Sequence, residues 1–286
     1  MSGLDIGLTA IEAPAASFDD LALAHDADYI DLLRLTSHRL IEDQSATGPA
    51  YAHIDPDTAM NSHTLEAALH SVGAAIAATD AVINGELANA FCAVRPPGHH
   101  AMRRKAMGFC FFNNVAVAVK HAIHQHGLER VAVVDFDVHH GNGTQDLLWH
   151  EPRAFLATSQ QMPLWPGSGD ASETGAHGQI LNLPLPPEST GAMMRAAYEA
   201  QVFPALDAFK PDLILISAGF DAHAADPLAN LNWHEDDFAW LTHRLCDLAA
   251  THAQGRVVSC LEGGYDLGAL QTSVAAHVSV LMERSL

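Results

Sequence analysis

Short apolar runs alternate repeatedly with longer amphipathic stretches along this chain, and few folds accommodate such a pattern. The apolar runs are rich in β-branched residues, as in strands that are buried on both faces of a sheet. We expect strands at Ala90–Val94, Val131–Phe136, Ala154–Thr158, Leu213–Ser217 and Val257–Leu261. We expect helices at Phe18–Leu35, Thr64–Ile83, Asn114–His126, Thr190–Phe209, Glu235–Ala253 and Leu267–Met282.

This alternation predicts an α/β fold with a mostly parallel central sheet and helices on both faces. A length of 286 residues gives room for a sizeable core, and no repeat or convincing linker divides the sequence. We therefore expect a single domain over residues 1–286. Two segments rich in proline and glycine, Arg95–Gly108 and Met162–Gly178, are expected to form long loops, which are often functional in compact domains.

The net charge of the chain limits the kinds of molecule that it is expected to bind. The chain carries 14 Lys and Arg against 34 Asp and Glu, a formal charge of −20, which disfavours direct binding to nucleic acid or to anionic membranes. A cationic partner, such as a lysine-rich peptide or a polyamine, would suit this surface, although acidity that serves solubility alone is an equally good interpretation.

The spacing of the cysteines and the length of the apolar runs indicate the cellular compartment. The four cysteines show no CxxC spacing and are expected to be buried free thiols. We find neither a signal-peptide pattern nor an apolar run of about 18 residues, the minimum for a membrane span. These features favour a reducing cytoplasm.

A carboxylate and an imidazole follow the strand expected at Val131–Phe136. Asp137 and His139 are two residues apart, so in extended chain their side chains project together. Ligand sites in open α/β sheets lie at the carboxyl ends of strands. A further carboxylate, Asp221, comes just after the strand expected at Leu213–Ser217.

Two carboxylates and one imidazole suit Zn²⁺ with a coordination position left open for water or substrate. Sites with mixed oxygen and nitrogen ligands also accept Fe²⁺, Co²⁺ or Mn²⁺. Taken alone, these three residues could equally be surface carboxylates and a solvated histidine.

Two more strand ends carry groups suited to hydrolysis. His99 and His100 follow a stiff Pro-Pro-Gly turn and are candidates for acid–base work beside a metal-bound water. Tyr265 follows paired glycines after the last expected strand, where its phenol could donate to a developing oxyanion. A polar surface pair of histidines and a tyrosine that covers the sheet are the structural alternatives.

Six motifs together resemble the histone deacetylase superfamily, which includes bacterial deacetylase-like amidohydrolases and acetylpolyamine amidohydrolases. They are RPPGHHA (Arg95–Ala101), GFCFFNN (Gly108–Asn114), DFDVHHGNGTQD (Asp135–Asp146), PGSG (Pro166–Gly169), SAGFDAHAADPL (Ser217–Leu228) and LEGGYDL (Leu261–Leu267). Two details are similar to the class II branch of the family: the asparagine in HHGNGT and the sequence SAGFDAH. The resemblance implies the arginase- and deacetylase-like three-layer α/β/α fold.

The resemblance also implies site roles. Asp137, His139 and Asp221 match the zinc ligands, and Tyr265 matches the tyrosine that polarises the scissile carbonyl. His99 and His100 match the tandem histidines, with His100 expected to act as general base and then acid.

Further roles follow for groups around the metal and the tunnel. Asp135 would orient His99, and Asn142 would orient His100. Phe109 and Trp165 match the aromatic walls of an acyl-lysine tunnel, Gly108 could offer its carbonyl to the substrate amide, and Leu228 would lie at the rim. A buried monovalent-cation site, implied to hold K⁺, would use Asp135, Asp137, His139, Thr158 and Ser159.

These roles predict zinc-dependent removal of acyl groups from lysine side chains in proteins or peptides. Because a neutral amide stabilises imidazolium less than a carboxylate does, the Asn142 partner should leave His100 less basic than His99. The family's usual opening strand and His-Pro segment are not visible before the helix expected at Phe18–Leu35, which leaves the tunnel rim and the inner acetate cavity without their usual elements.

The sequence leaves the substrate open. Leu228 is typical of acyl-lysine deacetylases, because polyamine-selective relatives carry an acidic residue there, yet an acetylpolyamine remains an alternative. A non-catalytic acyl-lysine binder is a rival that the presence of Tyr265 and of all three metal ligands disfavours. Arginase-like chemistry is disfavoured because ligands for one metal only are visible.

Overall fold

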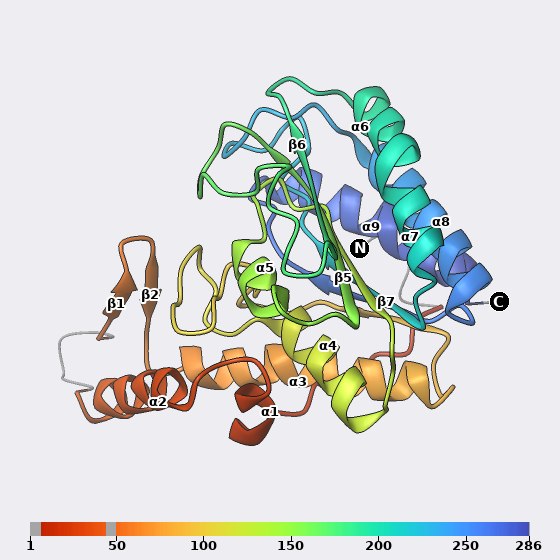
Figure 1. Cartoon of the computed structure of the whole chain (residues 1–286). Coiled ribbons are helices and arrows are strands. Elements are labelled where there is room, and N and C mark those ends of the chain that lie inside the picture. Colours follow the sequence, from red (N-terminus) through yellow and green to blue (C-terminus); the bar gives the residue numbers. More distant parts are fainter. Residues whose placement is uncertain (1–6, 44–49, 286) are drawn as a thin grey trace.

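The computed structural model describes residues 7–43 and 50–285. A six-stranded sheet lies at its centre, with all neighbouring strands parallel, in the order β3-β8-β7-β4-β5-β6 (Figure 1). These strands are β3 (Asn89–Cys92), β4 (Val131–Asp135), β5 (Ala154–Gln161), β6 (Ile180–Leu185), β7 (Leu213–Ala218) and β8 (Val257–Leu261). A separate antiparallel hairpin consists of β1 (Ala52–Asp55) and β2 (Thr58–Met60).

Helices cover both faces of the sheet, which confirms the predicted α/β/α architecture. On one face lie α1 (Phe18–Ala22), α2 (Ala27–Glu42), α3 (Thr64–Ile83) and α4 (Asn114–Gln125), seen low in Figure 1. On the other lie α6 (Gly191–Ala197), the π-helical turn η2 (Tyr198–Val202), α7 (Phe203–Phe209), α8 (Glu235–His252) and α9 (Leu267–Glu283). The short helix α5 (Asn142–Leu148) follows the loop after β4.

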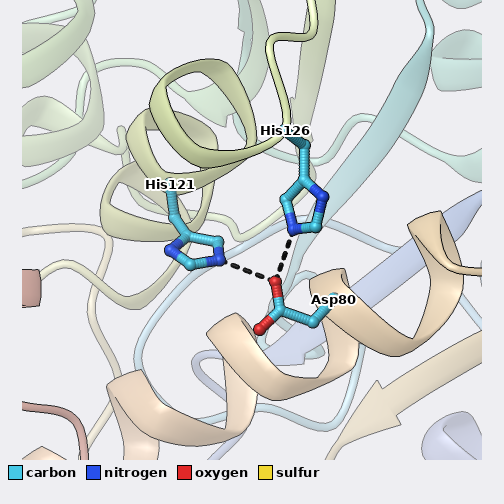
Figure 2. A group of neighbouring side chains, drawn as sticks. All are labelled: Asp80, His121 and His126. Atoms are coloured by element: carbon cyan, nitrogen blue, oxygen red, sulfur yellow. Dashed lines mark hydrogen bonds and ion pairs between the residues drawn. The ribbon is translucent and has the colours of Figure 1, made fainter.

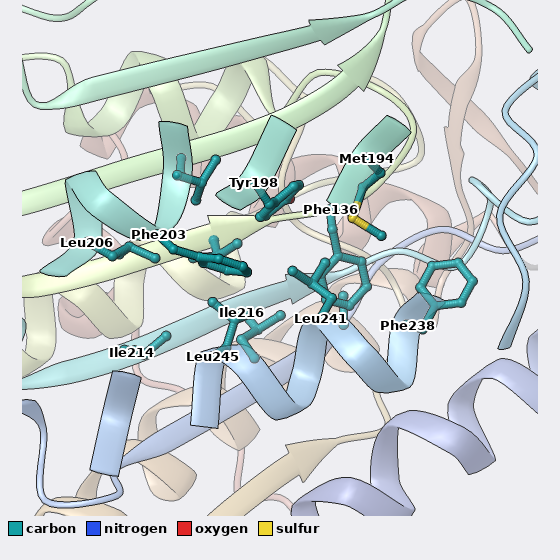
Figure 3. Close-up of a cluster of buried hydrophobic side chains, with 14 of the residues drawn as sticks. Phe136, Met194, Tyr198, Phe203, Leu206, Ile214, Ile216, Phe238, Leu241 and Leu245 are labelled. Atoms are coloured by element: carbon teal, nitrogen blue, oxygen red, sulfur yellow. The ribbon is translucent and has the colours of Figure 1, made fainter. Parts of the chain in front are cut away.

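The side-chain alternation of the strands divides the core into two layers. Val131 and Val133 pack with α3 and α4, whereas Ala132 and Val134 face the opposite cluster. In that second cluster, Ile214 and Ile216 of β7 lie against α8 (Figure 3). Because both faces are covered, nearly every residue of the central strands is buried, which explains why they appear as continuous apolar runs.

The structure differs from the sequence-based expectations in several places: α5 was not expected, and the helix expected at Thr190–Phe209 contains the π-helical turn η2. The edge strand β6 was not expected, because it contains Pro184, which a sheet accepts most readily at its edge. The helix expected at Phe18–Leu35 is interrupted: α1 ends at Ala22 and α2 begins after Asp26, while the His25 ring between them is buried against the Met102 carbonyl. The β1–β2 hairpin was also missed.

The structure describes the environment of the cysteines and of the most apolar long helix. All four cysteines are free and buried, as expected. Among the described helices, only α3 has the length and mean hydropathy of a membrane-spanning segment, and half of its apolar stretch is buried inside the fold. α3 thus has the burial of a core helix.

Candidate active site

The predicted catalytic and metal-binding groups meet at one edge of the sheet. Four neighbouring strands, in the order β3-β8-β7-β4, end there. Their carboxyl ends lead into the loops that carry His99 and His100, Tyr265, Asp221, and the pair Asp137 and His139. Crossover connections of a parallel sheet thus bring together residues that are up to 166 positions apart, from His99 to Tyr265.

Three buried side chains form a compact ligand set. The Nδ1 atom of His139 lies 3.0 Å from Oδ2 of Asp221 and 3.2 Å from Oδ1 of Asp137. Backbone N–H groups hold both carboxylates: Val138 donates to Asp221 at 2.9 Å, and Gly263 donates to Asp137 at 2.9 Å. The ligand atoms of the three side chains therefore converge.

The two carboxylates of this set favour a positive charge beside them. Burial, followed by the neighbouring Asp137 carboxylate, raises the pKa of Asp221 to about 7. For His139, burial favours the neutral ring, but hydrogen bonds to Asp137 and Asp221 outweigh it and raise the pKa to about 10. Two carboxylates and one imidazole, almost fully buried, fit Zn²⁺ and also Fe²⁺ or Mn²⁺.

The tandem histidines have different partners, as the sequence predicted. His99 Nδ1 lies 3.0 Å from the Asp135 carboxylate, and His100 Nδ1 lies 2.8 Å from the Asn142 side-chain oxygen. Burial opposes protonation of His99, but Asp137 and Asp135 together raise its pKa well above the usual value. Burial and the adjacent His99 charge lower the pKa of His100 well below its usual value. Burial and the neighbouring His99, rather than the Asn142 amide, thus make the pKa of His100 lower than that of His99.

A cavity of about 210 Å³ opens above the ligand set. Its lining combines the predicted tunnel residues with groups from the site: Asp57, His100, Gly108, Phe109, His139, Leu164, Trp165, Leu228 and Tyr265. The Trp165 ring packs edge-on against His100, with centroids 4.7 Å apart, and the Phe109 and Tyr265 rings are 6.1 Å apart. An aromatic mouth thus leads to polar groups at the base.

Tyr265 is held by its backbone and leaves its hydroxyl free for a ligand. Its backbone N–H donates to Asp226 at 2.7 Å, and no described residue hydrogen-bonds its hydroxyl. Burial, together with the Asp221 and Asp137 carboxylates, raises the pKa of the phenol. The hydroxyl therefore keeps its proton and can donate a hydrogen bond.

Gly108 is required by close packing. Its backbone has φ +57°, and a Cβ there would overlap the His100 ring and approach the Trp165 ring to 2.7 Å. Only glycine brings this segment of backbone so close to the cavity wall.

The residues predicted to hold a monovalent cation also lie together, but their role stays a prediction. Asp135 and Thr158 are paired across β4 and β5, and both are buried. The Thr158 hydroxyl donates to Gln160 at 3.1 Å, and Ser159 shares a 2.7 Å hydrogen bond with the Tyr198 hydroxyl. Any cation there would therefore rely mainly on backbone oxygens and Asp135.

Two groups in or beside the site were missed by the sequence reasoning. Asp57 lies in the turn of the unexpected β1–β2 hairpin and accepts the Gly108 N–H at 3.0 Å. Glu262 is buried behind the histidine turn and accepts the N–H groups of Gly98 and His99. Glu262 stands inside the LEGGYDL motif and could have been found as a charged residue at a buried strand end, whereas no local signal marks Asp57.

Comparison with known proteins places this geometry in a family. The histone deacetylase domain matches residues 2–281. The chain is 43% identical over 272 residues to "Histone deacetylase 10, chloroplastic" of Oryza sativa, covering 91% of this chain and 60% of that protein. It is 41% identical over 269 residues to "Histone deacetylase-like amidohydrolase" of Pseudomonas aeruginosa, covering 93% and 68% of the two chains.

A mammalian relative and a solved structure extend the similarity. "Polyamine deacetylase HDAC10" of Mus musculus is 36% identical over 291 residues, covering 98% of this chain and 42% of that protein. The crystal structure of the HDA15 HD domain superposes with a TM-score of 0.88 at 33% identity, covering 96% of this chain and 74% of that chain. The domain match over nearly the whole sequence and these identities show that the chain belongs to the histone deacetylase family of amidohydrolases.

Proposed function

We propose that this protein is a zinc-dependent deacetylase that acts on the acylated ε-amine of lysine in peptides or proteins. The observation that supports this most is the convergence of Asp137, His139 and Asp221 beneath a cavity that His100 and Tyr265 also line. Relatives named as deacetylases and as a deacetylase-like amidohydrolase agree with it.

The cavity suits an acyl-lysine side chain. Phe109 and Trp165 are each more than two-fifths exposed and present aromatic surface at the mouth, where the aliphatic part of a lysine can pack. The amide would then reach the polar groups at the base. Gly108 lies along the same wall and can offer its carbonyl oxygen to the amide N–H.

The residues at the base divide the chemistry between them. Zn²⁺ held by Asp137, His139 and Asp221 would polarise the amide carbonyl and lower the pKa of water. His100, neutral and oriented by Asn142, takes the proton of the attacking water and then protonates the leaving amine. The Tyr265 hydroxyl donates to the oxyanion that develops on the carbonyl oxygen, a contribution worth about 3–4 kcal/mol for a preorganised donor.

A panel of acylated amines tests the proposal. Zinc-loaded protein is incubated with acetyl-lysine peptide, acetylputrescine and acetylspermidine, and released acetate is measured, with Tyr265→Phe as the matched control. We expect hydrolysis of the peptide and a loss of roughly 10²- to 10³-fold in kcat for Tyr265→Phe. Binding of the peptide with no acetate released from any substrate would instead support a non-catalytic acyl-lysine binder.

An acetylpolyamine is a second candidate substrate, favoured by Asp57. This carboxylate lines the cavity, and its Oδ2 makes no hydrogen bond within the described part of the chain. A carboxylate there could attract a second ammonium group of a polyamine. Leu228 at the same mouth is apolar and 45% exposed, which favours a peptide instead. Faster hydrolysis of acetylspermidine than of the peptide, reversed by Asp57→Asn, would establish the polyamine.

A further inference from the structure

A second group of metal-binding side chains lies far from the cavity. Asp80 in the last turns of α3 faces His121 near the end of α4 and His126 just beyond it (Figure 2). The Nε2 atoms of both histidines lie 2.6 Å from the same oxygen, Oδ1 of Asp80. We call these three residues the distal cluster.

The distal cluster lies at the opposite edge of the sheet from the candidate active site. His126 comes five residues before Val131, where β4 begins, whereas Asp137 and His139 follow the other end of that strand. A strand of this length spans about 16 Å at roughly 3.3 Å per residue. The distal cluster therefore shares no residue with the active site and cannot hold the same ion.

The donor set and its access suit a divalent ion. A set of two imidazoles and one carboxylate binds Zn²⁺, Co²⁺ and Ni²⁺ in preference to Mg²⁺ or Ca²⁺. The side chain of Asp80 is 39% exposed, that of His126 20% and that of His121 11%. An ion can therefore enter from solvent, and water can complete its coordination.

The two helices hold the ligands in place without an ion. Val82 of α3 and Ala122 and Ile123 of α4 belong to one buried cluster against the sheet. The Asp80 carboxylate can only accept, so both histidines donate their Nε2–H to it, and the His121 Nδ1 atom is buried without a hydrogen-bond partner in the described part of the chain. Binding an ion through Nε2 would move the His121 proton to Nδ1 and would break no hydrogen bond except the one to Asp80, which the ion itself replaces.

A third group of similar composition lacks this freedom. In His223, His234 and Glu235, the Ala225 N–H donates to His223 Nδ1 at 3.0 Å. That bond places the ring proton on Nε2, the atom that faces Glu235 at 3.6 Å. To bind an ion through Nε2, His223 would have to move its proton to Nδ1 and lose the hydrogen bond from Ala225, which leaves the distal cluster as the better site.

We propose that Asp80, His121 and His126 bind a second divalent metal ion of the Zn²⁺ type, which joins α3 to α4. The ion would replace the two hydrogen bonds that now converge on Asp80, with only small movements of the side chains. Because it binds the folded protein alone, it stabilises the helix pair rather than taking part in hydrolysis.

Metal counting tests this proposal independently of activity. Protein stripped with chelator is loaded with Zn²⁺, separated from free metal, and its zinc content measured. We expect two equivalents for the unchanged protein and one for His126→Gln. The matched control is His124→Gln, an exposed histidine on the same helix end, which should keep both.

Asp221→Ala separates the distal site from the proposed catalytic one. This variant should lose the catalytic ion and keep one equivalent, and adding Zn²⁺ at about 100 times Kd should stabilise it by about 2.7 kcal/mol, seen as a rise in Tm. Adding His126→Gln to it should abolish both the equivalent and the rise. A zinc content that His126→Gln leaves unchanged, or an Asp221→Ala protein with no zinc, would overturn the distal site. The second result, combined with two equivalents in the unchanged protein, would instead fit two ions sharing the active site, as in arginase-like chemistry.

Discussion

The side chain of Glu262 accepts a hydrogen bond from the backbone N–H of His99 at 3.1 Å, across 163 positions of sequence. The same oxygen accepts the Gly98 N–H at 2.7 Å, and the other accepts the Ser217 hydroxyl at 3.2 Å. Glu262 therefore joins the end of β8, which leads to Tyr265, to the turn that carries the two histidines.

Two substitutions of Glu262 should distinguish the contribution of its hydrogen bonds to stability from that of its charge. Glu262→Ala leaves two buried N–H groups without acceptors, each costing about 1–3 kcal/mol, so we expect the free energy of unfolding to fall by about 2–6 kcal/mol. In Glu262→Gln the amide oxygen can accept both N–H groups while its NH₂ donates to Ser217, so the loss should stay below about 1 kcal/mol. Urea unfolding at pH 7 measures both, with the exposed Glu283→Gln as control. Equal losses for the two variants would contradict this.

Asn142→Asp should move the acidic limb of the pH–rate profile. A carboxylate beside Nδ1 stabilises the protonated His100 ring more than the amide does, so the pKa of His100 should rise. Since the general base must be unprotonated, kcat/KM should begin to fall at a higher pH than in the unchanged enzyme. The measurement is kcat/KM for an acetyl-lysine peptide from pH 5 to 9. An acidic limb that stays in place would show that Asn142 does not set the basicity of His100.

Much of the candidate site was predictable because its signals are local. The two-residue spacing of Asp137 and His139 at a strand end requires only that the strand be recognised, and Asp221 follows another such strand. Strands buried on both faces are easy to recognise, since covering helices make them apolar throughout. Pairing of His99 with Asp135 and of His100 with Asn142 followed from the family resemblance, and the contacts are present.

The groups that were missed depend on contacts between distant segments. Asp57 reaches the cavity only because its hairpin packs against the loop at Gly108. The distal cluster needs α3 and α4 to lie side by side with Asp80 facing His121, 41 positions away. The sequence spacing of Asp57 and Gly108, or of Asp80 and His121, does not predict that these residues are in contact. Their contacts are determined by the packing of the hairpin against the loop and of α3 against α4.

Gly263→Ala should weaken the proposed zinc site without altering its ligands. A Cβ at this position would overlap Oδ2 of Asp221 and lie 2.6 Å from Oδ2 of Asp137, so at least one carboxylate must move. We expect the affinity of the active site for Zn²⁺ to fall by roughly 10- to 100-fold, as when groups that orient ligands are lost. Competition with a zinc chelator measures it. The control is Gly268→Ala, where the nearest atom is a side-chain oxygen of Asp266 at 3.3 Å. Identical affinities for the two variants would contradict the packing argument.

The buried His277 should make the fold sensitive to acid. The Thr242 hydroxyl donates to the Phe238 carbonyl, so it accepts from His277 Nδ1, and Nε2 accepts from Ser259. The neutral ring is thus fully hydrogen-bonded, and burial lowers the pKa of His277 to about 3.

The unfolded chain takes up a proton at His277 near pH 6.5 while the folded protein does not, so stability falls as the pH drops from 6.5 towards 3. Between pH 7 and pH 5 this one group should lower the free energy of unfolding by about 2 kcal/mol. His277→Gln should be less stable at pH 7 but should lose about 2 kcal/mol less over that interval, measured by urea unfolding at each pH. The exposed His38→Gln should follow the unchanged protein. If His277→Gln shows the same acid sensitivity as the unchanged protein, the ring must be protonated in the folded state, and its burial as a neutral group would be disproved.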